Sequence, residues 1–239
     1  MNLPKLDIVL PCYNPANNWV NAIIESYQAL SKLLPQTAIK IILVNDGSTK
    51  QIAESEINQL QQHLVNFQYI HYQVNRGKGY ALRKGVAAAD APICLYTDVD
   101  FPYTTNSIIA LLQQLTSAQF DIAAGVKNKN YYKHVPPFRR FISKLLRACT
   151  GFVLRLKVAD TQCGLKGFNE KGKELFLSTT IDRYLFDLEF IFLASKNKQV
   201  TITPVPIELN ENVHFSSMRL GILFTEAKNF ITIFFKNFK

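Results

Sequence analysis

Short apolar runs alternate with helix-like segments in the first half of the chain, and a polar loop follows each run. Strands are expected at Leu6–Leu10, Ile39–Val44, Phe67–Tyr72, Ile93–Tyr96 and Ile122–Ala124. Helices are expected at Trp19–Leu34, from a cap at Ser48 or Thr49 to about Leu64, at Ala81–Ala89 and at Asn106–Leu115. This alternation predicts an α/β fold with a mainly parallel sheet flanked by helices, and ligands beyond the carboxyl ends of its strands.

Two aspartates, Asp98 and Asp100, directly follow the fourth expected strand. On an extended strand, side chains two residues apart point to the same side. Both carboxylates would then reach one hard cation such as Mg²⁺, which takes oxygen ligands. The alternative is a strand-end turn with two solvated aspartates, and this motif alone does not decide between them.

Two other loops at the same expected sheet edge favour a nucleotide diphosphate. Asp46 is suited to accept hydrogen bonds from a base or ribose, although an Asx-turn closing the strand is the alternative. Lys78 lies between Gly77 and Gly79, where the backbone allows close approach of a diphosphate to the ammonium group. The segment lacks the third glycine of a dinucleotide fingerprint, and no P-loop motif occurs.

Six ordered motifs resemble the family 2 glycosyltransferases of GT-A fold. They are PCYN (Pro11–Asn14), NDGS (Asn45–Ser48), NRGKGYA (Asn75–Ala81), TDVD (Thr97–Asp100), DTQCGLKGF (Asp160–Phe168) and FDLE (Phe186–Glu189). The last two narrow the resemblance to the polyprenyl-phosphate branch, the relatives of dolichyl-phosphate mannose and glucose synthases. The resemblance runs from about Lys5 to Arg219.

The resemblance implies a single GT-A (Rossmann-like) domain and a role for each matching residue. The residues implied to bind the donor are Pro11, Tyr13, Asn14, Asp46, Lys78, Asp98 and Arg219. Those implied to bind the metal, Mg²⁺ or Mn²⁺, are Asp98 and Asp100. The implied catalytic residues, near the reacting sugar, are Asp160, Gln162 and Lys166. Those implied to bind the acceptor phosphate are Lys127, Arg139 and Ser143.

Three positions depart from the family pattern. Pro15 replaces the glutamate usual after PxYN, and Asn45 replaces the first aspartate of the usual DDGS. Both bear on recognition of the base, so the donor can be a UDP- or a GDP-sugar. Lys127 stands where an arginine is common after the fifth strand, which keeps the charge but loses a bidentate fork.

The net charge of +9 is unevenly distributed, since no acidic residue occurs between Ile122 and Ala159. Such a basic block favours a polyanionic partner. From Phe138 to Leu156 the apolar spacing predicts an amphipathic helix with a basic face. We interpret it as an interfacial helix that meets an anionic membrane; the alternative is a core-packing helix whose basic face is solvated.

The chain is expected to divide into a catalytic domain, residues 1–215, and a C-terminal amphipathic helix, residues 216–239. The segment Leu220–Phe238 holds ten Leu, Ile and Phe residues, but the central Glu226 and Lys228 oppose a transmembrane span. We therefore expect this helix to lie in the interface or to pack on a membrane-protein partner. Without a signal peptide or paired cysteines, a cytoplasmic protein, peripheral on the inner face of the membrane, is predicted.

The function predicted from these features is metal-dependent, inverting sugar transfer from a nucleotide diphosphate sugar to a polyprenyl phosphate. An alternative is a family 2 glycosyltransferase of cell-surface polysaccharide synthesis, acting on a sugar hydroxyl of another glycan acceptor, with Asp160 as its base. A rival class is nucleic-acid binding. The aromatic residues of the basic helix, Phe138, Phe141 and Phe152, lie on its apolar face, so we expect no nucleic-acid partner.

Overall fold

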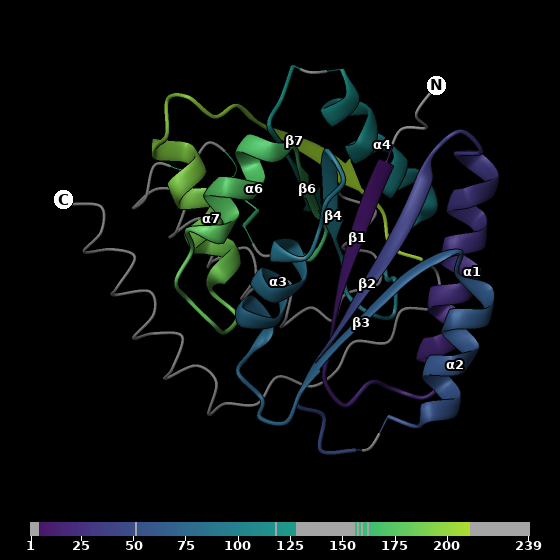
Figure 1. Cartoon of the computed structure of the whole chain (residues 1–239). Coiled ribbons are helices and arrows are strands. Elements are labelled where there is room, and N and C mark those ends of the chain that lie inside the picture. Colours follow the sequence, from purple (N-terminus) through teal and green to yellow (C-terminus); the bar gives the residue numbers. More distant parts are fainter. Residues whose placement is uncertain are drawn as a thin grey trace, which may run out of the picture.

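A computed structural model describes residues 5–50, 52–117, 119–127, 156, 158, 160–161 and 163–210. Within them, one seven-stranded sheet has the order β3-β2-β1-β4-β6-β5-β7 (Figure 1). The strands are β1 (Lys5–Cys12), β2 (Ala38–Asp46), β3 (Asn66–Tyr72), β4 (Ile93–Tyr96), β5 (Ile122–Lys127), β6 (Lys166–Phe168) and β7 (Ile202–Ile207). The helices are α1 (Trp19–Leu33), α2 (Glu54–His63), α3 (Lys78–Ala87), α4 (Thr105–Thr116), α6 (Glu170–Leu177) and α7 (Phe186–Lys196).

The sheet is parallel except at β6, which is inserted between β4 and β5. Lys166, the first residue of β6, is paired with Tyr96 at the end of β4 and with Ala124 on β5. An antiparallel strand begins at the edge where its parallel neighbours end. The segment before Lys166 therefore arrives at the same edge as the loops that follow β1, β2 and β4.

Helices cover both faces of the sheet because successive strand residues point to opposite sides. On one face, Ile8 and Leu10 belong to a core cluster that also includes residues of α1, α2 and α4. On the other, Val9 belongs to a cluster that includes residues of α3, α6 and α7. Figure 1 shows these three helices on one face of the sheet and α1, α2 and α4 on the other. The predicted α/β class, with a mainly parallel sheet flanked by helices, is confirmed.

Several predicted boundaries were wrong. Helix α2 begins at Glu54 and not after Ser48 or Thr49, because the Ser48 hydroxyl accepts a hydrogen bond from the backbone of Asn14 instead of capping a helix. Helix α3 begins at Lys78, three residues earlier than expected. Strand β1 continues through Pro11 to Cys12. Elements β6, α6, α7 and β7 were not predicted.

No helix within the described residues is long and apolar enough to cross a membrane. The predicted basic helix from Phe138 lies outside the described residues, apart from Leu156 at its end. The predicted C-terminal helix, residues 216–239, also lies outside them.

Candidate active site

The loop after β1 is joined to the loop after β2 by the side chain of Asn14. Its Nδ2 donates to Thr49 Oγ1 at 2.9 Å, and its Oδ1 accepts from the backbone N–H of Lys50 at 2.9 Å. Its own backbone N–H donates to Ser48 Oγ at 3.0 Å. Tyr13, next to it, is 48% exposed. Asn14 thus fixes the approach of the two loops and leaves an aromatic ring open at their edge.

The carboxylate of Asp46 holds the loop that leads to Lys78. Its Oδ1 accepts from the Tyr72 hydroxyl and the Arg76 backbone N–H, each at 2.8 Å. Its Oδ2 accepts from Asn75 Nδ2 at 2.8 Å and from the Gly77 backbone N–H at 2.9 Å. The side chain was expected to face a base or ribose. It is instead buried, at 3% exposure, with both oxygens occupied by the chain itself.

The ammonium group of Lys78 contacts the carboxylate of Asp98. This ion pair joins the first residue of α3 to the loop after β4. Desolvation lowers the pKa of Lys78, but the negative charges around it, Asp98 first, raise its pKa above the usual 10.5 overall. Lys78 is therefore a cation at neutral pH, and its partner is one of the two predicted metal ligands.

The two aspartates lie on a turn and not on an extended strand, which corrects the geometric premise of the prediction. Strand β4 ends at Tyr96, and the Phe101 backbone N–H closes the turn on the carbonyl of Asp98 at 3.0 Å. Phe101 adopts a left-handed φ of 44° and buries its ring in the core at 2% exposure, which anchors the turn.

The two carboxylates nevertheless influence each other. Desolvation and then the negative charge of Asp98 raise the pKa of Asp100 above its usual 3.8. A cation between them would relieve that repulsion, and carboxylate oxygens suit Mg²⁺ or Mn²⁺. Nowhere in the described residues do three or more His, Cys, Asp or Glu side chains form a metal-binding group. Two carboxylates would supply part of the ligand shell of a divalent cation, and substrate phosphates and water would supply the rest.

Two predicted residues distant in sequence, Asp160 and Lys127, meet at the end of β5. The Lys127 backbone N–H donates to Asp160 Oδ2 at 2.9 Å, and its ammonium lies 3.8 Å from Asp160 Oδ1. Asp160 is 3% exposed. The carboxylate thus orients Lys127, which was assigned to the acceptor phosphate, and carries the opposite charge beside it.

Lys166 lies in the protein interior at 0% exposure. Its ammonium donates to the carbonyls of Thr161 at 3.1 Å and Cys163 at 2.6 Å, and to Asp187 Oδ1 at 2.7 Å. An ammonium group has three donors. All three point to the chain, so this residue, expected near the reacting sugar, acts on the loop before it.

Gln162, Arg139, Ser143 and Arg219 lie outside the described residues, so those four assignments stay predictions. Of the remaining site residues, those on the loops after β1, β2, β4 and β5 lie at one sheet edge. The motifs gave no role to four residues: Asp187 and Tyr96, which bond to each other at the end of β4, and Glu189 and Arg83, which bind the segment 179–182. The signal that marks Asp187 and Glu189 is an acidic pair inside the otherwise apolar segment FDLEFIFLA.

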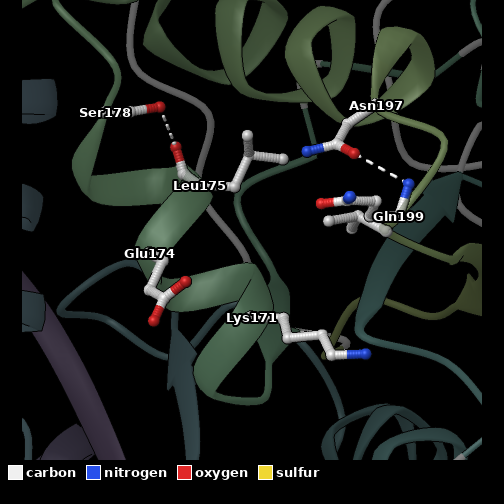
Figure 2. Close-up of a pocket in the computed structure, with 7 residues that line it drawn as sticks. Lys171, Glu174, Leu175, Ser178, Asn197 and Gln199 are labelled. Carbon is white, nitrogen blue, oxygen red and sulfur yellow. Dashed lines mark hydrogen bonds between the residues drawn. The ribbon is translucent and has the colours of Figure 1, made fainter.

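A separate hollow of about 650 Å³ lies beside α6 and the segment before β7 (Figure 2). It is lined by Lys171, Glu174, Leu175, Ser178, Asn197, Gln199 and Val200. In Figure 2, Ser178 bonds back to Leu175 and Gln199 to Asn197. β7 is parallel to β5, so its amino end marks the edge opposite the loops described above. None of the candidate residues lines this hollow.

The sequence matches the family model "Glycosyl transferase family 2" over residues 7–174. It is 25% identical over 205 residues to a dolichyl-phosphate beta-glucosyltransferase of Dictyostelium discoideum, covering 80% of this chain and 62% of that protein. It is 26% identical over 196 residues to glycosyltransferase AglD of Haloferax volcanii, covering 80% of this chain and 31% of that protein. The chain thus spans from about a third to just under two thirds of these relatives.

Solved structures share the fold. A mannosyl-3-phosphoglycerate synthase from Rubrobacter xylanophilus superposes with a TM-score of 0.70 at 15% identity, covering 97% of this chain and 73% of that one. A glucosyl-3-phosphoglycerate synthase from Mycobacterium tuberculosis, solved with Mg²⁺ and UDP, gives a TM-score of 0.65 at 16% identity, covering 98% and 79%. With the family match over most of its length, the chain belongs to glycosyl transferase family 2 and has the GT-A fold.

Proposed function

We propose that this chain transfers a sugar from a UDP- or GDP-sugar to a polyprenyl phosphate, with inversion at the anomeric carbon. The observation that carries the proposal is the contact between Lys78 and Asp98. It unites a lysine on a glycine turn with the carboxylate pair after β4, the two charge types that a metal-bound diphosphate requires. Similarity to dolichyl-phosphate beta-glucosyltransferases supports the polyprenyl phosphate acceptor.

In the donor half of the proposed site, Pro11, Tyr13 and Asn14 border the nucleotide. Lys78 would contact the donor diphosphate, and Asp98 and Asp100 would hold Mg²⁺ or Mn²⁺. The bound cation would supply positive charge that stabilises the leaving diphosphate. Asp46 keeps the Lys78 loop in place through the Arg76 and Gly77 backbone. Arg219 is proposed to close over the diphosphate.

In the acceptor half, Lys127, Arg139 and Ser143 bind the lipid phosphate. A phosphate is already ionised at neutral pH, so it attacks the anomeric carbon without a general base. The contact of Asp160 with Lys127 supports this division, because the Asp160 carboxylate accepts from the Lys127 backbone N–H and lies beside its ammonium group, so it orients Lys127. Gln162 is proposed to contact the sugar.

We further propose that the protein works at the inner, anionic surface of a membrane. The basic block that follows Lys127 and the apolar C-terminal segment, residues 216–239, support this placement. Each Lys or Arg near such a surface contributes about 1 kcal/mol. The C-terminal segment would lie in the interface or pack on a membrane-protein partner, beyond a catalytic domain of residues 1–215.

A donor screen tests the proposed reaction. UDP- and GDP-sugars are incubated with Mg²⁺ or Mn²⁺ and a short polyprenyl phosphate, and the lipid-linked sugar is quantified. We expect one donor to give product, and chelation of the metal with EDTA to abolish it. Transfer to a sugar hydroxyl alone would favour the polysaccharide alternative. Salt-dependent binding to generic DNA with no affinity for any nucleotide sugar would refute the proposal.

A substitution at Asp100 tests the metal-binding role proposed for the carboxylate pair. Asp100→Ala should lower turnover by at least about 10²-fold, because the developing charge on the diphosphate loses its stabilisation. The matched control is Asp90→Ala, which removes an exposed aspartate bonded to Lys40 near the amino ends of the strands. The control should retain wild-type turnover. An active Asp100→Ala enzyme would contradict the role given to the carboxylate pair.

A further inference from the structure

Helix α7 begins with two buried acids, Asp187 at 5% exposure and Glu189 at 0%. Successive residues on a helix are rotated by about 100°, so side chains two apart point in nearly opposite directions. These two carboxylates therefore reach different loops. Neither had been given a part in the proposed reaction, and burying a carboxylate is costly unless its partners are well placed.

Asp187 connects the ends of two strands. Its Oδ1 accepts from the Tyr96 hydroxyl at 2.5 Å and from Lys166 Nζ at 2.7 Å. Tyr96 is the last residue of β4, directly before the segment with Asp98 and Asp100. Lys166 in turn binds the carbonyls of Thr161 and Cys163. Asp187 thereby fixes the loop that begins with Asp160, through one intervening ammonium group.

Glu189 holds a different segment. Its Oε2 accepts from the backbone N–H groups of Thr180 and Ile181, each at 2.8 Å, and its Oε1 from the Thr180 hydroxyl at 2.9 Å. Arg83 of α3 donates to the carbonyl of Ile181 at 2.9 Å and contacts the Asp182 carboxylate. The segment 179–182 is thus bound on one side to α7 and on the other to α3.

That segment lies directly against the turn that carries Lys78. A Cβ placed on Gly77 would come within 2.5 Å of the Asp182 carbonyl oxygen, and one on Gly79 within 2.4 Å of the Ile181 carbonyl oxygen. The backbone N–H of Tyr80 donates to the Asp182 carbonyl at 3.2 Å. Contacts this close mean that any shift of the 179–182 segment moves the start of α3.

We propose that the first turn of α7 positions the two halves of the active site separately, with Asp187 acting through Lys166 on the Asp160 loop and Glu189 acting through residues 180–181 on the Lys78 loop. Both are positioning residues, since each acts through another group. This inference rests on the proposed function, because it assigns the Lys78 side to the donor diphosphate and the Asp160 side to the sugar and acceptor.

The two roles give opposite kinetic signatures, which a general loss of stability would not. Glu189→Gln should weaken binding of the donor diphosphate about tenfold, seen in the donor KM and in the Kd for UDP or GDP with Mg²⁺, with kcat per folded enzyme changed less than about threefold. Asp187→Asn should lower kcat about 10²-fold through misplacement of the reacting groups. It should change the nucleotide Kd less than it changes kcat, since Lys78 keeps its neighbour Asp98 although it loses the nearby negative charge of Asp187.

A matched control is available near the amino ends of the strands. Asp7 on β1 is 2% exposed and accepts from two successive backbone N–H groups, Asp90 at 2.7 Å and Ala91 at 3.0 Å, much as Glu189 does. Asp7→Asn should lower the melting temperature without changing kcat, donor KM or nucleotide Kd. If a carboxylate variant fails to fold, a milder variant replaces it. Thr180→Val removes one hydroxyl donor to Glu189, and Tyr96→Phe removes one hydroxyl donor to Asp187.

The outcomes separate the two proposals. If the wild-type enzyme transfers no sugar, the proposed function is wrong. Isothermal titration with UDP and GDP would then still test whether Glu189 positions the Lys78 loop. Active wild-type enzyme whose variants on both sides show the same kinetic change, or none beyond that of Asp7→Asn, would overturn the positioning inference alone. A loss of nucleotide affinity confined to Glu189→Gln and Thr180→Val supports it.

Discussion

At the scale of single residues, the active edge is organised by backbone approach as much as by side chains. Gly164 illustrates this, because a Cβ placed there would lie 2.7 Å from Asp98 Oδ2 and 3.2 Å from the Tyr103 hydroxyl. The Gly164 backbone N–H also donates to that hydroxyl at 2.9 Å. The absence of a side chain at Gly164 thus lets Asp98 remain between this loop and Lys78.

Gly164→Ala should therefore displace the Asp98 carboxylate. The close contact falls on the end of a flexible side chain, so we expect a small loss of stability, about 1 kcal/mol, but a larger loss of turnover, about tenfold or more. Thermal unfolding and steady-state kinetics measure the two effects. A variant that loses stability and keeps wild-type turnover would show that the placement of Asp98 is unimportant.

The raised pKa of Asp100 has a measurable consequence. Its ionised form is disfavoured in the folded protein, so its contribution to stability decreases as the pH rises through the folded pKa. Metal binding needs the ionised form, so affinity should begin to fall at a pH above the usual aspartate value as the solution is acidified. Carboxyl ¹³C NMR should find the pKa of Asp100 above 3.8, and lower in Asp98→Asn than in the wild type. Equal values in both proteins would contradict coupling of the pair.

At the scale of elements, Asp121 fixes the start of β7, a strand that was not predicted. Its Oδ2 accepts from the Thr201 backbone N–H at 2.8 Å and hydroxyl at 2.9 Å, and its Oδ1 from Asn169 Nδ2 at 2.8 Å. Desolvation raises the pKa of Asp121, but these hydrogen bonds lower it below 3.8 overall. The lowered pKa adds stability to the fold at pH values above the pKa that Asp121 has in the unfolded chain. This stability is lost as the pH falls through the folded pKa.

Asp121→Ala should reduce the free energy of unfolding by about 3 kcal/mol at pH 7, since it removes bonds to a charged acceptor. The difference from wild type should shrink on acidification toward pH 3, where protonation weakens the same bonds in the parent protein. Urea unfolding at several pH values measures this. A difference that stays constant with pH would mean that the charge of Asp121 contributes nothing.

Sequence patterns located the elements with clear periodicity and missed those without it. The first five strands and the helices between them were predicted because each strand has a short run in which apolar residues predominate. Strand β6 is three residues long, Lys166–Phe168, and starts with a lysine, so no periodicity marks it. Helix α7 is buried on nearly all sides and shows no polar face, which removes the usual signal of a surface helix.

The candidate site divides in the same way. The meeting of Lys78 with Asp98 was predictable, because both follow parallel strands at one edge of the sheet. The structural roles of Asp46 and Lys166 were not predictable. Each depends on backbone N–H or carbonyl groups that tertiary packing brings within reach, and no side-chain motif encodes those groups.

At the scale of the whole molecule, the charge distribution predicts how the protein meets lipid. The full chain should bind vesicles that contain about 30% anionic lipid and dissociate when salt is raised to about 0.5 M, because added ions screen surface charge. Co-sedimentation measures this, with neutral vesicles as the control. Equal binding to both vesicle types would leave the basic block without a role at the membrane, and apolar contacts would then account for attachment.

The late position of β6 in the sequence also sets an order of events during synthesis on the ribosome. Strand β4 ends at Tyr96, yet its second neighbour, Lys166–Phe168, emerges about seventy residues later. Until then a nascent chain has one half-sheet with an unpaired edge, a surface prone to mispairing. A stalled or truncated product lacking β6 should thus be recognised as unfinished by chaperones, although it already carries the glycine turn and both aspartates.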